Sequence, residues 1–115
     1  MTEGQVHVEI LSFCPKYERA VRILAKPWTP IVVRALLAGP RRFSQIREYT
    51  GHISDRVLSQ RLKELEREGI VERRVIPSTP VRIEYALTPK GHELQQVVEA
   101  VQRWADRWLA VPDGH

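Results

Sequence analysis

Hydrophobic and polar positions along the chain predict a mainly helical protein with one β-hairpin. Residues 6–10 alternate between apolar and polar side chains, which is typical of a short strand or an extended arm. Apolar residues at helical spacing, introduced in most segments by a proline or a polar cap, predict helices over residues 15–25, 31–37, 43–49, 55–68 and 90–109. Alternation in two further segments, separated by a proline-containing loop, predicts strands over residues 70–75 and 82–87.

The order of these elements predicts the fold class. Two short helices joined by a turn at residues 50–53, then a hairpin, form the outline of a winged helix-turn-helix. We therefore expect an α+β, mainly α fold in which the N- and C-terminal helices form a dimer interface. A length of 115 residues is that of one domain, so residues 1–115 are predicted to form a single winged helix-turn-helix domain.

The helix over residues 55–68 has the pattern of a DNA recognition helix. On a helical wheel Leu58, Leu62 and Leu65 fall on one side, which predicts a buried stripe. The opposite side carries basic and amide side chains and no acid. A major groove accepts one helix, and arginine and glutamine suit guanine and adenine edges. The candidate DNA contacts from this helix and its cap are Ser54, Arg56, Ser59, Gln60, Lys63 and Arg67. A solvated helix face that contacts nothing is the alternative.

The hairpin is the second candidate contact, because a wing typically lies along the DNA backbone or minor groove. Its candidate residues are Arg73, Arg74, Ser78, Thr79 and Arg82, and the alternative is a plain exposed hairpin. Arg41 and Arg42, just before the third helix, are candidates for gripping a phosphate or are simply charged loop residues.

The last helix, predicted at about residues 90–110, carries a candidate dimerisation seam. Apolar residues recur there at steps of three and four, which is heptad-like spacing: Leu94, Val97, Val101, Trp104 and Trp108, widened by Val98 and Ala105. Pairing with a second chain is the favoured interpretation, and packing onto the domain's own core is the alternative.

Charge and composition narrow the function classes. Lys plus Arg total 18 against 14 Asp plus Glu, a net charge of +4. Residues 41–82 hold 10 basic and 6 acidic residues, so 10 − 6 = +4 lies in that window, which points to a polyanion such as double-stranded DNA. No apolar run is long enough for a membrane helix, and no signal peptide or disulfide is expected, so the predicted location is cytoplasmic. No metal site, cofactor or enzyme activity is expected, because the four histidines are scattered and no phosphate-binding loop occurs.

The ordered motifs resemble those of the HxlR-type transcription regulators, a branch of the MarR-like winged-helix proteins. The matching runs cover roughly residues 14–108. They include Leu36–Phe43 (LLAGPRRF), Ile53–Glu66 (ISDRVLSQRLKELE), Gly69–Arg73 (GIVER) and Glu84–Pro89 (EYALTP). The resemblance implies a homodimeric bacterial repressor or activator with a winged-helix fold. It also implies that Cys14 occupies the position of a thiol sensor in several members.

Cys14 is the only candidate for redox chemistry, since it is the sole cysteine. It directly precedes Pro15 and Lys16 at a helix start, where the helix dipole and the lysine favour the thiolate. A small electrophile or oxidant acting as inducer is one interpretation, and a buried small hydrophobic residue is the other.

The sequence therefore predicts a DNA-binding transcriptional regulator, with repression as the favoured direction, that binds a palindromic operator as a homodimer. Two alternatives stay open. One is a winged-helix protein-interaction module. The other is a small-molecule-gated regulator with a pocket at the dimer interface lined by Trp28, Trp104 or Trp108.

Overall fold

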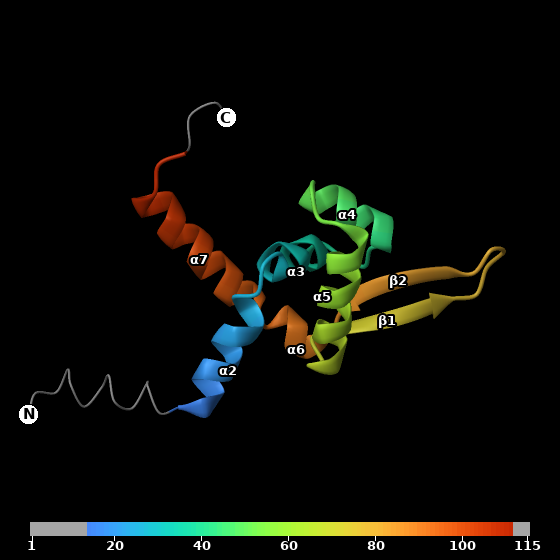
Figure 1. Cartoon of the computed structure of the whole chain (residues 1–115), viewed down its shortest axis with the longest axis horizontal. Coiled ribbons are helices and arrows are strands. Elements are labelled where there is room, and N and C mark those ends of the chain that lie inside the picture. The colour runs from blue at the N-terminus through green and yellow to red at the C-terminus, as the bar shows by residue number, and fades with distance from the viewer. Residues whose placement is uncertain (1–13, 112–115) are drawn as a thin grey trace, which may run out of the picture.

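The computed structural model describes residues 14–111 and contains a helical body with a projecting hairpin. Figure 1 shows the hairpin at one end of the molecule, the first and last helices at the other end, and the remaining helices between them. The mainly helical fold with one two-stranded sheet is as predicted, and the strand or arm predicted at residues 6–10 lies outside the described residues. The elements are α2 (Pro15–Leu24), α3 (Thr29–Leu37), α4 (Phe43–Thr50), α5 (Asp55–Arg67), β1 (Val71–Ile76), β2 (Arg82–Leu87), α6 (Pro89–His92) and α7 (Gln95–Trp108).

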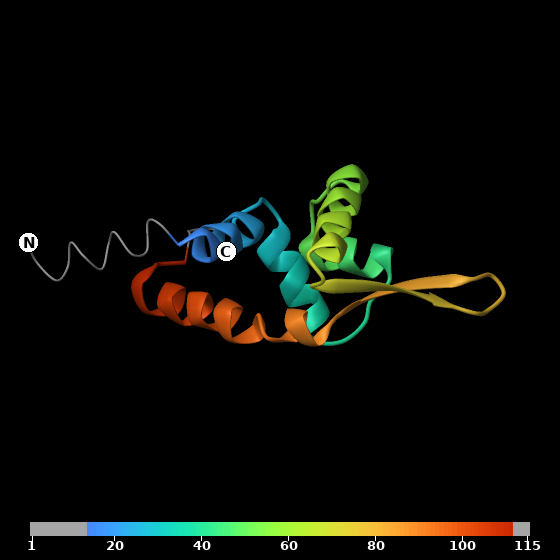
Figure 2. The same ribbon diagram turned by 90° about the horizontal axis from the view of Figure 1, so that it is seen from below.

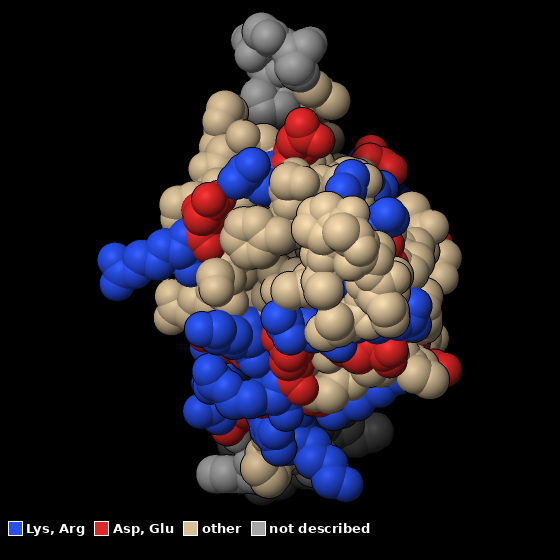
Figure 3. Space-filling model, turned by 90° about the vertical axis from the view of Figure 1, so that its right-hand side faces the viewer, with Lys and Arg blue, Asp and Glu red and all other residues tan. Residues whose placement is uncertain are grey.

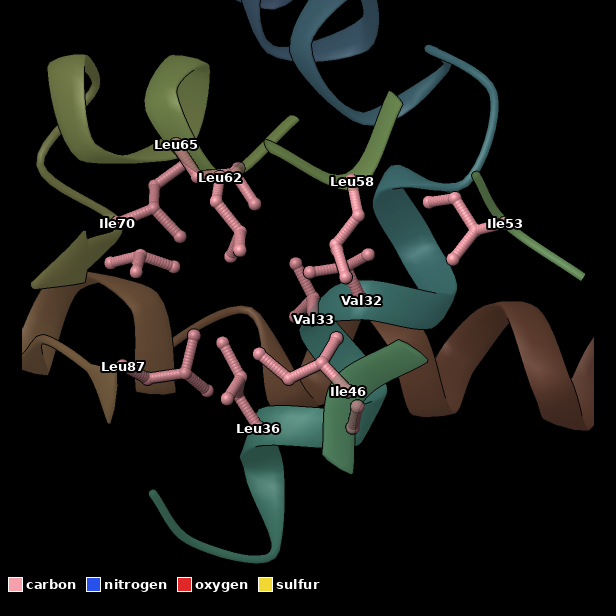
Figure 4. Close-up of a cluster of buried hydrophobic side chains, with 12 residues drawn as sticks. Val32, Val33, Leu36, Ile46, Ile53, Leu58, Leu62, Leu65, Ile70 and Leu87 are labelled. Atoms are coloured by element: carbon pink, nitrogen blue, oxygen red, sulfur yellow. The ribbon is translucent and has the colours of Figure 1, made fainter. Parts of the chain in front are cut away.

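The core forms where α3, α4 and α5 meet the base of the hairpin (Figure 4). The leucine stripe of α5 is buried as predicted, with each of Leu58, Leu62 and Leu65 at most 1% exposed. Because burying one such side chain contributes about 1.5–3 kcal/mol, this stripe holds α5 in one rotational setting on the body. Opposite it lie Val32, Val33 and Leu36 of α3, Ile46 of α4, and Ile53, Ile70 and Leu87 from the turn and the hairpin.

The hairpin is a regular antiparallel pair, with Val71 opposite Leu87 at its base and Ile76 opposite Arg82 near its tip. An isolated β-bridge, which the sequence pattern did not indicate, is added at its edge. Arg41 and Tyr85 exchange two backbone hydrogen bonds of 2.9 and 2.8 Å between N and O atoms. This bridge ties the segment before α4 to β2, so the hairpin and the helix-turn-helix unit are joined by backbone as well as by side chains.

The start of the second helix differs from the sequence prediction. The second helix was predicted to begin at residue 31, but it begins at Thr29, its N-cap is Trp28 at φ 74°, and the Trp28 carbonyl accepts the first helical hydrogen bond, from Val32. Thr29 instead faces the interior at 2% exposed, because the Trp28 turn brings it inside the first helical turn.

Within residues 14–111 the structure contains no helix with the length and apolarity that a membrane crossing requires.

The predicted single C-terminal helix over residues 90–109 is wrong, because two helices, α6 and α7, occupy this stretch. Thr88 caps α6 by accepting from the Gly91 backbone N–H at 3.1 Å, and its hydroxyl also bonds the Gly69 carbonyl at 2.6 Å. At Leu94 the helical hydrogen bonding changes: the Leu94 N–H donates to the Gly91 carbonyl, three residues back, at 3.0 Å. This anchoring of α6 to the start of the hairpin sets the direction of α7, which local helix propensity could not reveal.

Replacing Gly91 with alanine is expected to destabilise the fold. A Cβ atom at this position would overlap the backbone oxygen of Ile70, so the helix must move away from the hairpin. Overpacking against backbone typically costs about 1–3 kcal/mol. Urea unfolding followed by circular dichroism should show a lower midpoint, while the neighbouring exposed His92→Ala serves as the control. Equal midpoints for Gly91→Ala and the wild type would contradict this close approach.

Candidate nucleic-acid interface

The outer face of α5 is a row of exposed polar and basic side chains. Arg56, Gln60, Lys63 and Arg67 are all exposed on it, and Ser59 is half-buried on the flank. Within the part of the chain that the structure describes, none of the four exposed side chains forms a hydrogen bond or a salt bridge. An arginine or lysine without an internal partner keeps its full capacity to bind phosphates or base edges.

The start of α5 is set by Ser54. Its backbone is extended, and its hydroxyl oxygen accepts from the Val57 N–H at 3.1 Å, so one of the helix's free N–H groups is satisfied. The remaining N–H groups of the first turn stay available to an anion. Ser54 therefore has a defined capping function in addition to any contact with DNA.

An ion pair holds the two helices of the helix-turn-helix together. The guanidinium of Arg47 in α4 donates to Asp55, the first residue of α5, at 2.7 Å between Nη1 and Oδ1. Asp55, through this hydrogen bond and its charge, raises the pKa of Arg47 above its ordinary value. The two side chains are 42% and 65% exposed, so the pair orients α5 relative to α4 more than it adds to the stability of the fold. Sequence analysis missed this pair, because eight positions and a turn separate the two residues and no helical spacing relates them.

The wing residues are divided between the two faces of the hairpin. Successive side chains of a strand point to opposite faces, so Arg73 lies on the face of Tyr85, while Arg74 and Arg82 lie on the face of Glu84. Arg74 also donates to Glu72 at 2.8 Å between Nε and Oε2. Its charge is therefore partly balanced within the wing, whereas Arg73 and Arg82 form no salt bridge with any described residue. Ser78 and Thr79 are exposed at the tip, where the Ser78 hydroxyl donates to the Pro80 carbonyl.

The two arginines before α4 have different surroundings. The side chain of Arg41 is half-buried, donates from Nε to the Ala35 carbonyl at 2.6 Å, and lies over the Tyr49 ring at 5.3 Å from its centroid. These contacts hold the Arg41 side chain against the body of the protein. Arg42 is exposed and forms no salt bridge with another residue in the range 14–111, so of the two it is the one placed to meet a phosphate.

Basic side chains are numerous at the wing end of the molecule. Figure 3, which looks towards the wing, shows Lys and Arg side chains concentrated over the lower part of this face, with a few acids among them. The candidate cations whose side chains form neither a salt bridge nor a hydrogen bond with a described residue are Arg42, Arg56, Lys63, Arg67, Arg73 and Arg82. This surface combines the exposed outer face of α5, a helix of the size that a DNA major groove accepts, with basic side chains on the adjoining wing.

The opposite end of the molecule is apolar. Figure 2 shows α2 and α7 extending away from the body on the side remote from the wing. The helices form one wall each of a groove of about 780 Å³, whose lining includes Val21 and Leu24 of α2 and Val97 and Val101 of α7. Of the predicted seam, only Leu94 and Val98 pack partly on the domain's own core, whereas Trp104 and Trp108 are 58% and 64% exposed. Trp28, in contrast, packs against the core.

Cys14 is the N-cap of α2 and lies at the same end. Its side chain is half-buried and forms no capping hydrogen bond. Cys14 is therefore partly exposed in the single chain.

Comparisons with known proteins agree with this geometry. A family model described as HxlR-like helix-turn-helix matches residues 23–113. The chain is 52% identical over 96 residues to YvaP of Bacillus subtilis, an HTH-type transcriptional regulator, covering 84% of this chain and 89% of YvaP. It is 46% identical over 102 residues to the HTH-type transcriptional regulator YodB of the same organism, covering 89% and 91%.

Solved structures extend the similarity to the whole fold. The reduced form of YodB from B. subtilis superposes with a TM-score of 0.78 at 46% identity, covering 88% of this chain and 99% of that one. A quinone-bound form of YodB has a TM-score of 0.74 at 43% identity, covering 84% and 100%. The redox regulator HypR in its oxidised form has a TM-score of 0.77 at 32% identity, covering 85% and 100%.

Proposed function

The chain belongs to the HxlR-like helix-turn-helix family of DNA-binding transcriptional regulators, and on that premise we propose that it is a homodimeric bacterial repressor whose α5 and wing contact a palindromic operator. The observation that carries this proposal is the outer face of α5. It presents Arg56, Gln60 and Lys63 without internal partners, on a helix that its buried leucines hold in place.

The residues divide into two kinds of contact. Arg56 and Gln60, near the start of α5, are the candidates for base edges, since the N-terminal part of a recognition helix enters the major groove. Lys63, Arg67 and the wing arginines are candidates for phosphates, which position the protein without selecting sequence. Arg41 is assigned to the scaffold because its guanidinium is engaged by Ala35 and Tyr49.

A second copy of the chain is the proposed occupant of the apolar groove. Both α2 and α7 have one-sided apolar faces, yet neither helix has a single buried residue in the isolated chain. Helices of 10 and 14 residues gain most of their stability from packing such a face. The groove lining on α7 ends at Ala105, and Trp104 and Trp108 are exposed on the same helix beside it, which adds to the apolar surface that a stable homodimer would bury.

A two-fold dimer through this end leaves both wings and both α5 helices on the outside. Two recognition helices then reach successive major grooves about 34 Å apart, so the operator half-sites are expected roughly 10 to 11 base pairs apart. Because the contacts to each half-site are equivalent, the operator is expected to be a palindrome.

Cys14 is the proposed switch of this dimer. It is accessible, precedes α2, and lies at the end of the molecule where the second copy packs. The structures of relatives include quinone-bound and diamide-treated YodB and oxidised HypR, which are the forms that thiol-directed reagents and oxidation produce. Oxidant or electrophile modification of Cys14 is expected to change the packing of α2 in the dimer and release DNA.

The first test is binding of the purified protein to the DNA upstream of its own gene, titrated with salt. Each phosphate contact contributes a slope of about −0.9 in log K against log salt, and 6–10 contacts lower affinity about 10³–10⁵-fold between 50 and 200 mM salt. Five unpaired cations of each chain, Arg42, Lys63, Arg67, Arg73 and Arg82, are assigned to phosphates, which gives 2 × 5 = 10 in the dimer, so we expect a loss of about 10⁵-fold. Absence of binding both to this DNA and to random duplex at low salt would sink the proposal and favour the protein-interaction alternative.

The same titration is repeated after diamide or benzoquinone treatment. We expect the treated wild type to lose affinity for the operator and the Cys14→Ser variant to keep it. An equal loss in both proteins would show that the reagent acts elsewhere, and no loss in the wild type would remove Cys14 as the switch.

A further inference from the structure

The first helix, α2, is attached to the body of the protein by little apolar packing. It extends away from the body (Figure 2), and of its residues only Ile23 packs partly against the core. The recognition helix α5, in contrast, is fixed on the body by its buried leucines. In the proposed dimer α2 packs against the second copy, so its angle to α5 affects the separation of the two recognition helices.

Arg61 of α5 reaches the turn between α2 and α3. Its Nε donates to the Pro27 carbonyl at 2.8 Å, and its Nη1 lies 3.4 Å from Oε1 of Glu64 on the same helix. The Arg61 side chain is only 13% exposed. Helical periodicity places it about 140° from Arg56 and about 160° from Lys63 around the helix axis. This basic side chain of the recognition helix is therefore turned away from the DNA face.

The acceptor of this hydrogen bond is a well-defined point of the chain. Proline restricts its own backbone, and the next residue, Trp28, turns the chain into α3 at φ 74°. The Pro27 carbonyl accepts no backbone hydrogen bond from a described residue, so Arg61 supplies its partner within residues 14–111. The bond therefore ties the middle of α5 to the backbone that directly follows α2.

Two ion pairs cross the same boundary, but their cations are more exposed. Arg19 pairs with Glu68 at 2.6 Å, and Arg19 is 70% exposed. Lys26 pairs with Glu64 at 3.1 Å, and Lys26 is 47% exposed. Exposed pairs contribute little, because water screens the charges and the long side chains lose conformational freedom. A hydrogen bond from a charged and largely buried donor is stronger, so Arg61 forms the firmest of these polar contacts.

We propose that Arg61 is a positioning residue that fixes the angle between α2 and α5 and thereby selects the half-site spacing of the operator. This rests on the proposed function, in which α2 and α7 join two copies and each α5 reads one half-site. A dimer that meets a wrong spacing must turn α5 relative to α2, which breaks the bond from Arg61 to Pro27. The loss of that bond is a penalty of about tenfold in the binding equilibrium, which native spacing does not incur.

Replacing Arg61 with methionine removes the donors and keeps a long side chain that suits a helix. The change leaves Glu64 paired with Lys26, and Pro27 is exposed, so water can reach its carbonyl. We therefore expect the fold to be retained, which circular dichroism checks. Arg61→Ala is the second variant, and it separates the loss of the donors from any packing of the methionine.

The fixing of α2 is tested without DNA, by pulsed electron paramagnetic resonance. Spin labels at Glu18→Cys on α2 and Lys63→Cys on α5, in a Cys14→Ser background, report their separation within one chain when labelled protein is mixed with excess unlabelled protein. We expect a narrow distance distribution when Arg61 is present and a broader one for Arg61→Met and Arg61→Ala. Lys26→Met, which removes an exposed cation from the same turn, is the matched control and should stay narrow. Equal widths with and without Arg61 would overturn the proposal.

The effect on DNA is measured with duplexes whose half-sites are moved by one base pair, which turns one half-site by about 35° relative to the other. For each protein, fluorescence anisotropy gives the ratio of the Kd at the altered spacing to the Kd at the native spacing. We expect this ratio to be about tenfold lower for Arg61→Met than for the wild type, and unchanged for Lys26→Met. A purely structural defect would weaken binding at every spacing and leave the ratio as it is.

The outcomes separate this inference from the proposed function. A wild-type ratio well above one that Arg61→Met and Arg61→Ala both keep would overturn the selection of spacing by Arg61. A wild type that does not bind the operator, or binds every spacing equally, would count against the proposed dimer on a palindrome. The distance measurements, which need neither DNA nor a dimer, would still decide whether Arg61 fixes α2.

Discussion

Replacing Arg56 with alanine is expected to weaken operator binding by roughly 1–3 kcal/mol, which is about 5- to 150-fold, and to relax sequence preference. Arg56 is exposed in the first turn of α5, two residues after the Ser54 cap, and has no partner within residues 14–111. Its guanidinium is therefore free to form a bidentate contact with a guanine edge. Removing it leaves that base edge unpaired in the complex.

The specificity part of this prediction separates a base contact from a phosphate contact. Binding of each variant to the operator and to single-base variants of one half-site, measured by fluorescence anisotropy, gives the discrimination at each position. Arg56→Ala should lose discrimination at one position of the half-site. Lys63→Ala should weaken binding to all sequences about equally and reduce the salt slope by about one.

Arg103→Ala on α7 is the matched control for the loss of one exposed positive charge. It should bind the operator as tightly as the wild type. If Arg56→Ala bound with unchanged affinity, the assignment of α5 as the recognition helix would be wrong.

The second large effect is expected at the other end of the molecule. Replacing Trp104 and Trp108 together with alanine should convert the dimer to monomers, because the two indoles are the largest exposed apolar side chains next to the groove between α2 and α7. Buried aromatic side chains dominate the binding energy of many interfaces. Light scattering at micromolar concentration should report half the mass, and operator affinity should fall with it, since a monomer reaches only one half-site.

Neither tryptophan belongs to the core, so circular dichroism should show an unchanged fold for the double variant. Val75→Ala is the control, because it shortens an equally exposed apolar side chain on the wing. A second variant, Val101→Asp, places a charge directly in the groove and should also give monomers. Persistent dimers in both Trp104→Ala/Trp108→Ala and Val101→Asp would show that the copies meet through another surface.

Local patterns were sufficient to predict the helix-turn-helix unit and the hairpin. The leucine stripe of α5 follows from helical spacing, the Ser54 cap and Gly69 at φ 73° mark its two ends, and alternation marks both strands. Each of these signals depends on residues a few positions apart. The side chains on the outer face of α5 could be predicted from the sequence for the same reason, because all of them lie on one helix and their spacing fixes the face they share.

The surroundings of individual cations could not be predicted in this way. The sequence gives no reason to distinguish Arg41, Arg47 and Arg56 within the basic segment. In the structure Arg41 lies over Tyr49 and Arg47 pairs with Asp55, and of the three only Arg56 is unpaired. Their partners come from other elements, and a partner is set by how those elements pack. The composition of the segment therefore indicated a polyanion, but the packing decided which side chains are free to bind it.

The sequence by itself determined the order of the helix-turn-helix and the hairpin, the buried face of α5 and the basic character of its outer face, because these depend on short-range periodicity and charge. Only the tertiary structure decided that the last helix is broken after His92, that α2 and α7 leave an apolar groove open, and that ion pairs join α2 and the turn after it to the C-terminal end of α5 and its C-cap. The physical reason is that these features arise between segments far apart in the chain. Arg19 and Glu68, for example, are 49 positions apart and meet only because α2 packs beside the end of α5.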